Sequence, residues 1–321
     1  MNPILIDTDP GIDDAVALML AVQRPEIDIR AVTACSGNLR ADYSAANVLR
    51  VLDHVGRSDI PVAVGALAPL SRPYPKDPFS HGDDGLGNTG LPASSRTPDS
   101  RFAADFIVDT AVQYPGDLTI VALGPLTNVA LALTRSPALT RQVRELVLTG
   151  GAFGLTPYGA LRATGDNPVS EWNIFVDPEA ARLVFHSGLQ ITAVGLDFSC
   201  HPRINLSDEI QSRLRNSDTP EAKFLTSVLG FVNARGFESY SAIIDALTMA
   251  IAINPSLANT VPLKVDIETA SPLTLGQTVV DRREHFRWDQ LPTVNVVSEV
   301  DYEAFHALLL STFVRESVAR Q

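Results

Sequence analysis

The stretch from Asp7 to Asp14, which reads Asp-Thr-Asp-Pro-Gly-Ile-Asp-Asp, constrains the fold of this chain more than any other feature. It follows Ile4-Leu5-Ile6, an apolar run typical of a buried strand, and precedes Ala15–Val22, an apolar run of helical length that ends before Pro25. Four carboxylates therefore gather where a strand turns into a helix. Open α/β sheets bind their ligands at such carboxyl ends of strands.

Four neighbouring carboxylates repel one another and need positive charge nearby. A helix N-terminus stabilises each nearby anion by only about 0.3–1 kcal/mol, which is too little for this cluster. Solvated helix-capping acids would explain an isolated Asp-Asp pair. Here the flanking strand and helix favour a bound hard cation such as Ca²⁺, which takes about six to eight oxygen ligands.

The bulk properties narrow the range of partners. The chain has 321 residues and shows no linker, repeat or break in composition, so we expect one domain over residues 1–321. Its net charge of −12 argues against nucleic acid or an anionic membrane as the main partner, because both attract basic surfaces. No apolar segment approaches the roughly 20 residues of a membrane span. We therefore expect a small-molecule substrate.

The cysteines and the N-terminus indicate where the protein works. Cys35 and Cys200 lie far apart and form no metal-binding or redox motif, so both are expected to be reduced. The chain enters its first strand directly, without a basic region followed by an apolar stretch and a cleavage site. We expect a soluble, cytoplasmic protein.

Short apolar strands alternate with helices through the first two-thirds of the chain. The predicted strands are Ile4–Asp7, Ile29–Cys35, Pro61–Val64, Leu118–Leu123, Leu146–Thr149 and Ile191–Gly195. The predicted helices between them are Tyr43–Val55, Phe102–Gln113, Asn128–Thr134 and Pro178–His186. This alternation predicts an α/β fold with a mostly parallel sheet covered by helices on both faces.

The last third adds helices and short strands to the same domain. Helices are predicted at Ser207–Asn216, Ala222–Phe237, Ala242–Ala252 and from Tyr302 to about Ser317, and strands at Leu263–Ile267, Thr278–Asp281 and Thr293–Val297. Two long connections, Ala66–Arg101 and Gly150–Trp172, follow predicted strands. Long loops in compact domains are usually functional, so we expect these two to form the walls or lid of a site.

Two polar segments follow strands of the predicted sheet. Asn38 comes after the second strand, and Thr127-Asn128 comes after the fourth. Each would serve as a helix cap when taken alone. The glycine-rich segment His81–Gly87 lacks the strand-to-helix context of a phosphate-binding loop, so we interpret it as a mobile lid.

Two further sites carry charge in unusual surroundings. Glu171-Trp172-Asn173 combines an acid, an aromatic ring and an amide, which suits hydrogen bonding to sugar hydroxyls. Asp245 lies within the apolar run Ala242–Leu247. Because a charged side chain is rarely buried unless it is paired or binds metal, Asp245 is predicted to do one or the other.

These residues together resemble the nucleoside hydrolases of the inosine-uridine preferring type, which cleave the N-glycosidic bond of ribonucleosides. The opening Asp7–Asp14 run looks like their signature. Further similar segments occur in the same order at Thr33–Asn38, His81–Gly87, Thr119–Leu133, Leu146–Gly151, Glu171–Ala181, Gly195–Asp197, the helix around Asp245, and Gly276–Arg282. The resemblance covers nearly the whole chain. It implies one α/β domain with a Rossmann-like sheet, Ca²⁺-dependent release of ribose and free base, a role in purine or pyrimidine salvage, and a homodimer or homotetramer.

The resemblance also implies roles for individual residues. Ca²⁺ would be bound by Asp9, Asp14, Asp245 and the main-chain carbonyl of Thr127, with Asp9 acting as general base toward the Ca²⁺-activated water. The ribose hydroxyls would be contacted by Asp13, Asn38, Glu171 and Asn173, and Asp7 would support the metal ligands from behind.

The chain departs from the family pattern at two positions. Several members carry a histidine before the late aspartate, where it protonates the leaving base, whereas this chain has Ile244. We expect His81 or Tyr240 to act as proton donor instead, or Trp172 to stack on the base. Members also place a ribose-binding asparagine six residues before the glutamate, and here that residue is Gly165. We expect Asn167 to replace it.

Two other classes of protein share parts of this pattern. One is a Ca²⁺-dependent ribonucleoside-binding protein with weak or lost catalysis. The other is a phosphatase of the haloacid-dehalogenase kind, in which Asp7 of Asp7-Thr8-Asp9 would be the nucleophile. That chemistry wants a well-placed lysine, and this chain is nearly lysine-free.

Overall fold

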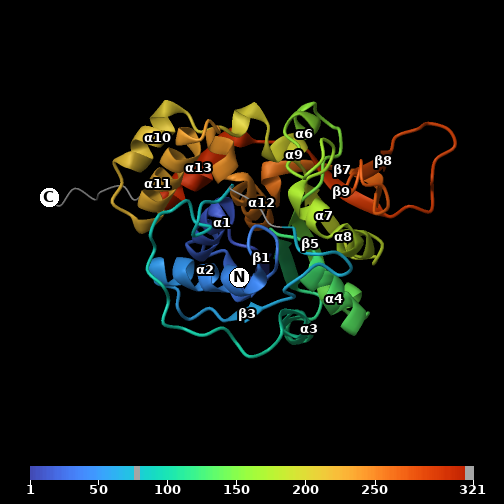
Figure 1. Cartoon of the computed structure of the whole chain (residues 1–321), viewed down its shortest axis with the longest axis horizontal. Helices are drawn as coiled ribbons and strands as arrows, with labels where there is room; N and C mark the ends of the chain where they lie inside the picture. The colour runs from blue at the N-terminus through green and yellow to red at the C-terminus, as the bar shows by residue number, and fades with distance from the viewer. Residues whose placement is uncertain (76–79, 315–321) are drawn as a thin grey trace.

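One mixed sheet of nine strands runs through the protein in the order β3-β2-β1-β4-β5-β6-β9-β7-β8 (Figure 1). The structure is a computed structural model, and it describes residues 1–75 and 80–314. Its strands are β1 (Asn2–Thr8), β2 (Ile27–Ala34), β3 (Val62–Val64), β4 (Leu118–Ala122), β5 (Val143–Thr149), β6 (Ile191–Val194), β7 (Ala258–Ile267), β8 (Thr278–Asp281) and β9 (Thr293–Val300). Only the pairings of β7 with β8 and with β9 are antiparallel within this sheet, so the predicted α/β fold with a mostly parallel sheet is confirmed.

The strand order places a ligand-binding position next to β1. From β1 the sheet grows in one direction through β2 and β3, and in the other direction through β4, β5 and β6. In open α/β sheets, ligands bind outside the carboxyl ends of the strands where the strand order reverses. In this sheet that position lies between β1 and β4.

Helices cover both faces of the sheet, as the alternating pattern predicts. The larger ones are α1 (Ile12–Val22), α2 (Ala41–His54), α3 (Ala103–Gln113), α4 (Thr127–Arg135), α8 (Pro178–Phe185), α10 (Asp208–Arg215), α11 (Pro220–Ala234), α12 (Ile244–Ile253) and α13 (Tyr302–Phe313). The short ones are α5 (Leu139–Gln142), α6 (Tyr158–Leu161), α7 (Trp172–Val176), α9 (Leu196–Ser199) and the 3₁₀ turns η1 (Pro202–Ile204), η2 (Ser239–Ala242) and η3 (Pro255–Leu257).

The C-terminal helix is shorter than predicted. It ends at Phe313, because Val314 has extended backbone angles, with φ −112° and ψ 101°. The remainder of the predicted helix, residues 315–317, lies outside the described residues.

Strand β1 is buried on both sides, which explains its unbroken apolar run. Ile4 and Ile6 belong to one hydrophobic core, which contains α1, α2, α11, α12 and α13. Leu5, between them, belongs to a second core on the opposite face, which contains α3, α4 and α8. Helices α1 and α12 lie close together in the first core, where every residue of α1 is buried (Figure 1). This packing brings the start of α12 beside the start of α1.

The structure also bears on the expectations about the cysteines and about membrane-spanning segments. Cys35 and Cys200 are both free and buried. Within residues 1–75 and 80–314, no helix combines the length and the apolar character needed to cross a membrane.

Candidate active site

The polar residues predicted to be functional converge at the strand-order reversal. The acidic run leaves the end of β1, and its Asp14 lies in the first turn of α1. Asn38 follows β2, Thr127 opens α4 after β4, and Asn173 reaches the ends of β4 and β5. Since these strands are neighbours in the sheet, segments far apart in the sequence meet at one edge.

Asp9 is enclosed by the loops that follow β2 and β4. Its Oδ2 accepts a hydrogen bond of 2.5 Å from the backbone N–H of Asn38. A Cβ atom on Gly37 would lie 2.0 Å from Asp9 Oδ2, and one on Gly124 would lie 2.2 Å from Asp9 Oδ1. Both loops can close on the carboxylate only because these two residues lack side chains. Asp9 Oδ1 is buried without a hydrogen-bond partner.

Asp14 and Asp245 meet at the starts of two helices. Asp14 accepts hydrogen bonds from the Thr8 hydroxyl and from the backbone N–H of Gly11, the latter at 2.9 Å. Asp245 is the second residue of α12, whose packing against α1 brings its carboxylate close to Asp13 and Asp14. One ligand atom from each of these three residues lies within 4.8 Å of the other two.

Burial and mutual repulsion dominate the electrostatics of this cluster. Burial, and after it the charge of Asp14, raises the pKa of Asp9 and of Asp13 well above the usual range. Burial and then the charge of Asp13 raise the pKa of Asp245 in the same way. Such shifts show how unfavourable several buried negative charges are without a cation.

The donor set suits a hard divalent cation. All of the clustered ligands are carboxylate oxygens, the kind that Ca²⁺ and Mg²⁺ prefer. In addition, Asp9 Oδ1 and Asp13 Oδ1 are buried with no hydrogen-bond partner, and an ion would satisfy both. The geometry brings Asp13 into the cluster, although its expected role was sugar binding alone.

Asp7 lies behind the cluster. Its Oδ1 accepts hydrogen bonds from the Thr33 hydroxyl at 2.6 Å and from the Asn128 amide at 2.8 Å. Burial raises the pKa of Asp7 to about 7. Because Asp7 is fully buried and does not line the cavity, the structure gives no support to its use as a nucleophile.

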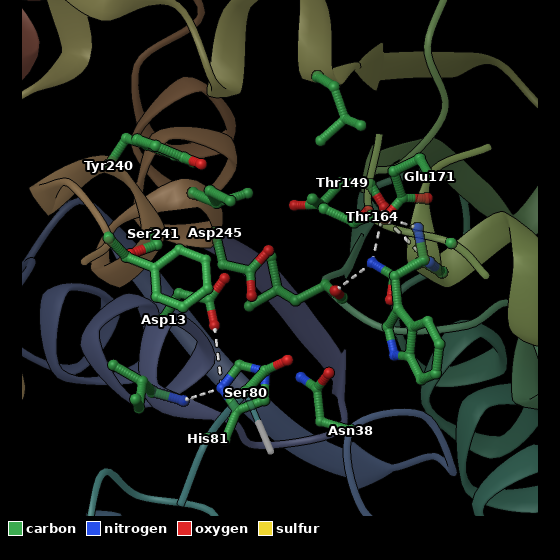
Figure 2. A pocket seen from close by; sticks show the side chains of 18 of the residues that line it. Asp13, Asn38, Ser80, His81, Thr149, Thr164, Glu171, Tyr240, Ser241 and Asp245 are labelled. Atoms are coloured by element: carbon green, nitrogen blue, oxygen red, sulfur yellow. Dashed lines mark hydrogen bonds and ion pairs between the residues drawn. The ribbon is translucent and has the colours of Figure 1, made fainter. Parts of the chain in front are cut away.

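A cavity of about 350 Å³ opens beside the acidic cluster (Figure 2). Eight of the predicted site residues line it: Asp13, Asn38, His81, Glu171, Trp172, Asn173, Tyr240 and Asp245. Asp9, Asp14 and Thr127 do not line the cavity. The hydroxyl of Thr127 donates to Asp177, the buried N-cap residue of α8, and this contact fixes the first turn of α4.

Glu171 and Asn173 are held rigidly at one side of the cavity. Glu171 is the N-cap of α7, and its carboxylate accepts hydrogen bonds from the backbone N–H groups of Gly151, Asn173 and Ile174. Burial raises the pKa of Glu171, while these hydrogen bonds lower it. The Asn173 amide donates to the carbonyl of Leu123, directly after β4, at 2.7 Å and to that of Thr149, the last residue of β5, at 3.1 Å.

The structure does not bring Asn167 to the cavity. Its amide donates to the Leu275 carbonyl, and its side-chain oxygen accepts from Val169 and Ser170. Gly165 and its neighbour Asp166 line the cavity instead. A Cβ atom on Gly165 would lie 2.2 Å from Ser170 Oγ, so the loop follows a path that spacing along the sequence does not reveal.

His81 lies against the start of α1. Its Nδ1 accepts a hydrogen bond of 3.0 Å from the backbone N–H of Ile12 and lies 3.9 Å from Asp13 Oδ1. An accepting Nδ1 carries no proton, so the neutral ring carries its proton on Nε2. The ring lines the cavity.

Tyr240 lies across the cavity from Glu171, and Ile244 also lines the cavity (Figure 2). The Tyr240 hydroxyl points toward the cavity (Figure 2). Burial, more than any nearby charge, raises the pKa of this phenol, so it stays protonated at neutral pH. Ile244 lines the cavity next to Asp245 and cannot donate a proton.

Sequence reasoning missed several polar residues in the lining: Ser80, Thr149, Thr164, Asp166 and Ser241. Thr149 could have been predicted from the sequence, because it ends a predicted strand and other predicted strands are followed by site residues. Its hydroxyl donates a hydrogen bond of 2.7 Å to Thr248. Ser80, Thr164 and Asp166 lie on loops and Ser241 lies in the short 3₁₀ turn η2, and their positions depend on tertiary packing.

Comparison with known proteins identifies the family. Residues 4–307 match the sequence profile described as inosine-uridine preferring nucleoside hydrolase. The chain belongs to this family. The pyrimidine-specific ribonucleoside hydrolase RihA of Citrobacter koseri is 38% identical over 313 residues, covering 96% of both chains. RihA of Shewanella sp. strain MR-7 is 39% identical over 318 residues, covering 97% of this chain and 96% of its own.

Solved structures of nucleoside hydrolases share the fold. A plant nucleoside hydrolase, the PpNRh1 enzyme, superposes with a TM-score of 0.86 at 33% identity and covers 98% of this chain and 99% of its own. A purine-preferring ribonucleoside hydrolase from Gardnerella vaginalis has a TM-score of 0.84 at 27% identity, covering 97% of this chain and 98% of its own. This nucleoside hydrolase is therefore an enzyme that hydrolyses ribonucleosides to ribose and base, as the resemblance implied.

Proposed function

We propose that this nucleoside hydrolase uses Ca²⁺ to cleave pyrimidine ribonucleosides in preference to purine ribonucleosides. The observation that carries the metal requirement is the buried cluster of Asp13, Asp14 and Asp245 with Asp9 nearby. One oxygen of Asp9 and one of Asp13 have no hydrogen-bond partner. The pyrimidine preference is supported by the relatives named pyrimidine-specific, which are 38–39% identical, whereas the purine-preferring structure is 27% identical.

The metal ligands in this proposal are Asp9, Asp14, Asp245 and the Thr127 carbonyl, with Asp13 beside them. A bound Ca²⁺ would lower the pKa of a water molecule and balance the repulsion among the carboxylates. Asp9 is the general base: its free Oδ1 accepts the proton of the water that attacks the anomeric carbon. Because Asn38 already holds Oδ2, the carboxylate is oriented for that transfer.

The ribose lies between the acidic cluster and Glu171. Asp13, Asn38, Glu171 and Asn173 provide carboxylate and amide groups for its hydroxyls, in agreement with their positions in the cavity lining. The transition state carries oxocarbenium character, as in other glycosidic cleavages.

The leaving base takes its proton from Tyr240 or from His81. Both line the cavity, the phenol of Tyr240 is protonated at neutral pH, and the neutral His81 ring carries its proton on Nε2. Trp172 also lines the cavity and stacks with Phe175, with 6.0 Å between ring centroids. We assign Trp172 to substrate contact without a proton-transfer role.

A reducing-sugar assay tests the proposal directly. Uridine, cytidine, inosine, adenosine and guanosine are compared in EGTA and after addition of Ca²⁺ or Mg²⁺. We expect ribose release from uridine and cytidine first, and its loss in EGTA with recovery in Ca²⁺. Binding of uridine without ribose release would favour the binding-protein alternative, and phosphate release from a monoester would favour the phosphatase.

Cytoplasmic location and a homodimer or homotetramer remain part of the proposal. Analytical ultracentrifugation of the purified chain measures the assembly. A monomer at micromolar concentration would contradict that part.

A further inference from the structure

Arg162 connects two walls of the cavity. It is the C-cap residue of α6, in the segment between β5 and α7, and its guanidinium lies over the Tyr240 ring with Cζ 4.2 Å from the ring centroid. One guanidinium nitrogen donates to the Cys200 carbonyl at 3.0 Å. The other donates to the Glu238 carboxylate at 2.6 Å, just before η2. The guanidinium is thus held in place from two directions while it covers the ring.

The backbone of Tyr240 is anchored separately. Its N–H donates to the side-chain oxygen of Asn205 at 2.9 Å, and the Asn205 amide donates to the same Glu238 carboxylate at 3.2 Å. Asn205 therefore fixes the backbone position of Tyr240, and Arg162 restricts the rotation of the Tyr240 ring. With the ring held at both points, the hydroxyl keeps its direction toward the cavity (Figure 2).

The charge of Arg162 also favours proton donation by the Tyr240 hydroxyl. A guanidinium over an aromatic face is attracted to the ring, and it stabilises a developing phenolate. It lowers the pKa of Tyr240 against the larger effect of burial, which raises it. The phenol remains protonated at neutral pH, yet gives up its proton more readily than it would without Arg162.

We propose that Arg162 is a positioning residue, which holds the Tyr240 hydroxyl toward the departing base and so supports the proton transfer that Ile244 cannot provide. This inference rests on the proposed function. In the step concerned, the bond between the anomeric carbon and the base nitrogen breaks, and its electron pair goes to the base. The Tyr240 proton moves to the base, and the phenolate regains a proton from water. Arg162 touches neither substrate nor water in this step.

The test compares two leaving groups. The leaving group of uridine is uracil, which needs a proton as it departs. The leaving group of p-nitrophenyl riboside is nitrophenolate, which is stable and needs none. Arg162→Met keeps an unbranched aliphatic side chain but removes the guanidinium and its charge. We expect it to lower kcat on uridine about tenfold and kcat on p-nitrophenyl riboside less than about twofold, because only the first substrate uses the acid. Arg162→Lys, which keeps the charge, should recover part of the loss.

A matched control and a double variant complete the experiment. Arg203 also lies over a tyrosine, with Cζ 5.4 Å from the Tyr302 ring centroid, but neither residue lines the cavity. Arg203→Met should leave both rates unchanged. Tyr240→Phe should reproduce the effect of Arg162→Met, and combining the two should add little, because they remove the same interaction.

Two results would overturn the inference, and a third would overturn the function on which it rests. An equal loss on both substrates in Arg162→Met would show a merely structural role. A fully multiplicative loss in the double variant would show that Arg162 and Tyr240 act independently. If the unmodified enzyme released ribose from neither substrate, the proposed function itself would fail, and that outcome is distinct from the other two.

Discussion

In the proposed function the two ends of the cavity are built from different parts of the chain. The proposed sugar end consists of carboxylates and amides near the ends of β1, β2, β4 and β5, several of which are held by hydrogen bonds. The proposed base end consists of the lining residues Ile12, Val232, Phe237, Tyr240 and Ile244, of which all but Ile12 come from the last third of the chain. On this proposal, sugar recognition depends on the sheet, whereas base recognition depends on helices and loops packed over it.

The first prediction is that the sugar end discriminates strongly between ribonucleosides and 2′-deoxyribonucleosides. Removing the 2′-hydroxyl should lower kcat/KM by roughly 10⁴-fold, because buried groups that bind a hydroxyl are left unpaired without it. The measurement compares uridine with 2′-deoxyuridine at saturating Ca²⁺. Equal turnover of the two would show that the sugar end is not built around that hydroxyl.

Replacing the proposed base should have the next largest effect. Asp9→Asn keeps the shape of the side chain and an acceptor for the Asn38 N–H, but it removes the proton acceptor, so kcat should fall about 10³-fold. Stopped assays of ribose release measure the change, with Ca²⁺ binding followed by calorimetry. Asp42→Asn, at a surface carboxylate paired with Arg40, is the control. A loss below tenfold would remove Asp9 from the role of base.

A substitution at the base end should increase activity. Ile244→His places an imidazole beside the leaving base, and we expect kcat on uridine to rise up to about tenfold, because an added acid assists departure. Little change is expected for p-nitrophenyl riboside, whose leaving group needs no proton. A fall in kcat on both uridine and p-nitrophenyl riboside would show that Ile244 is needed for packing at this end, and that a histidine there does not act as an acid.

Asp7→Asn tests the buried layer behind the sugar end and should have the smallest effect on activity. The folded-state pKa of Asp7 is about 7, against an ordinary value of 3.8. The folded state thus binds a proton that the unfolded state releases, so the stability from this group falls as pH rises from about 4 to about 7. Asp7→Asn has no titratable group at this position. Its free energy of unfolding, relative to that of the unmodified protein, should therefore rise by up to about 1.4 kcal/mol per pH unit.

Urea unfolding at several pH values in EGTA measures this difference. Parallel stability curves for the two proteins would contradict the raised pKa of Asp7. Ribose release should persist in Asp7→Asn, whereas a nucleophile at this position would make the variant inactive toward every substrate.

Much of the fold could be predicted from sequence periodicity. The predicted strands and longer helices occur where the structure has them, with ends that differ by a few residues. The short helices α5, α6, α7 and α9 were not predicted, because four or five residues carry too little periodic signal. The final helix was predicted too long, since the apolar pattern continues past the point where the backbone becomes extended.

The candidate site could be predicted only where its residues follow strands or form a motif. Asp13, Asn38, Glu171 and Asn173 line the cavity as expected. Asn167 does not, because it was placed by counting along a loop, and the loop path depends on Gly165 packing against Ser170. Thr164 lies on a similar loop and Ser241 in the short 3₁₀ turn η2, and nothing in their local sequence distinguishes them from surface residues.

The sequence alone determined the alternating α/β fold, the carboxylate run at the end of the first strand, and the absence of a histidine before Asp245, because these are properties of neighbouring residues. Tertiary structure alone decided that Asp13 joins Asp245 in the acidic cluster, and that Arg162 covers Tyr240. Each of these contacts joins segments more than 70 residues apart. Such contacts arise from the packing of α12 on α1 and of one loop on another, and that packing leaves no local pattern in the sequence.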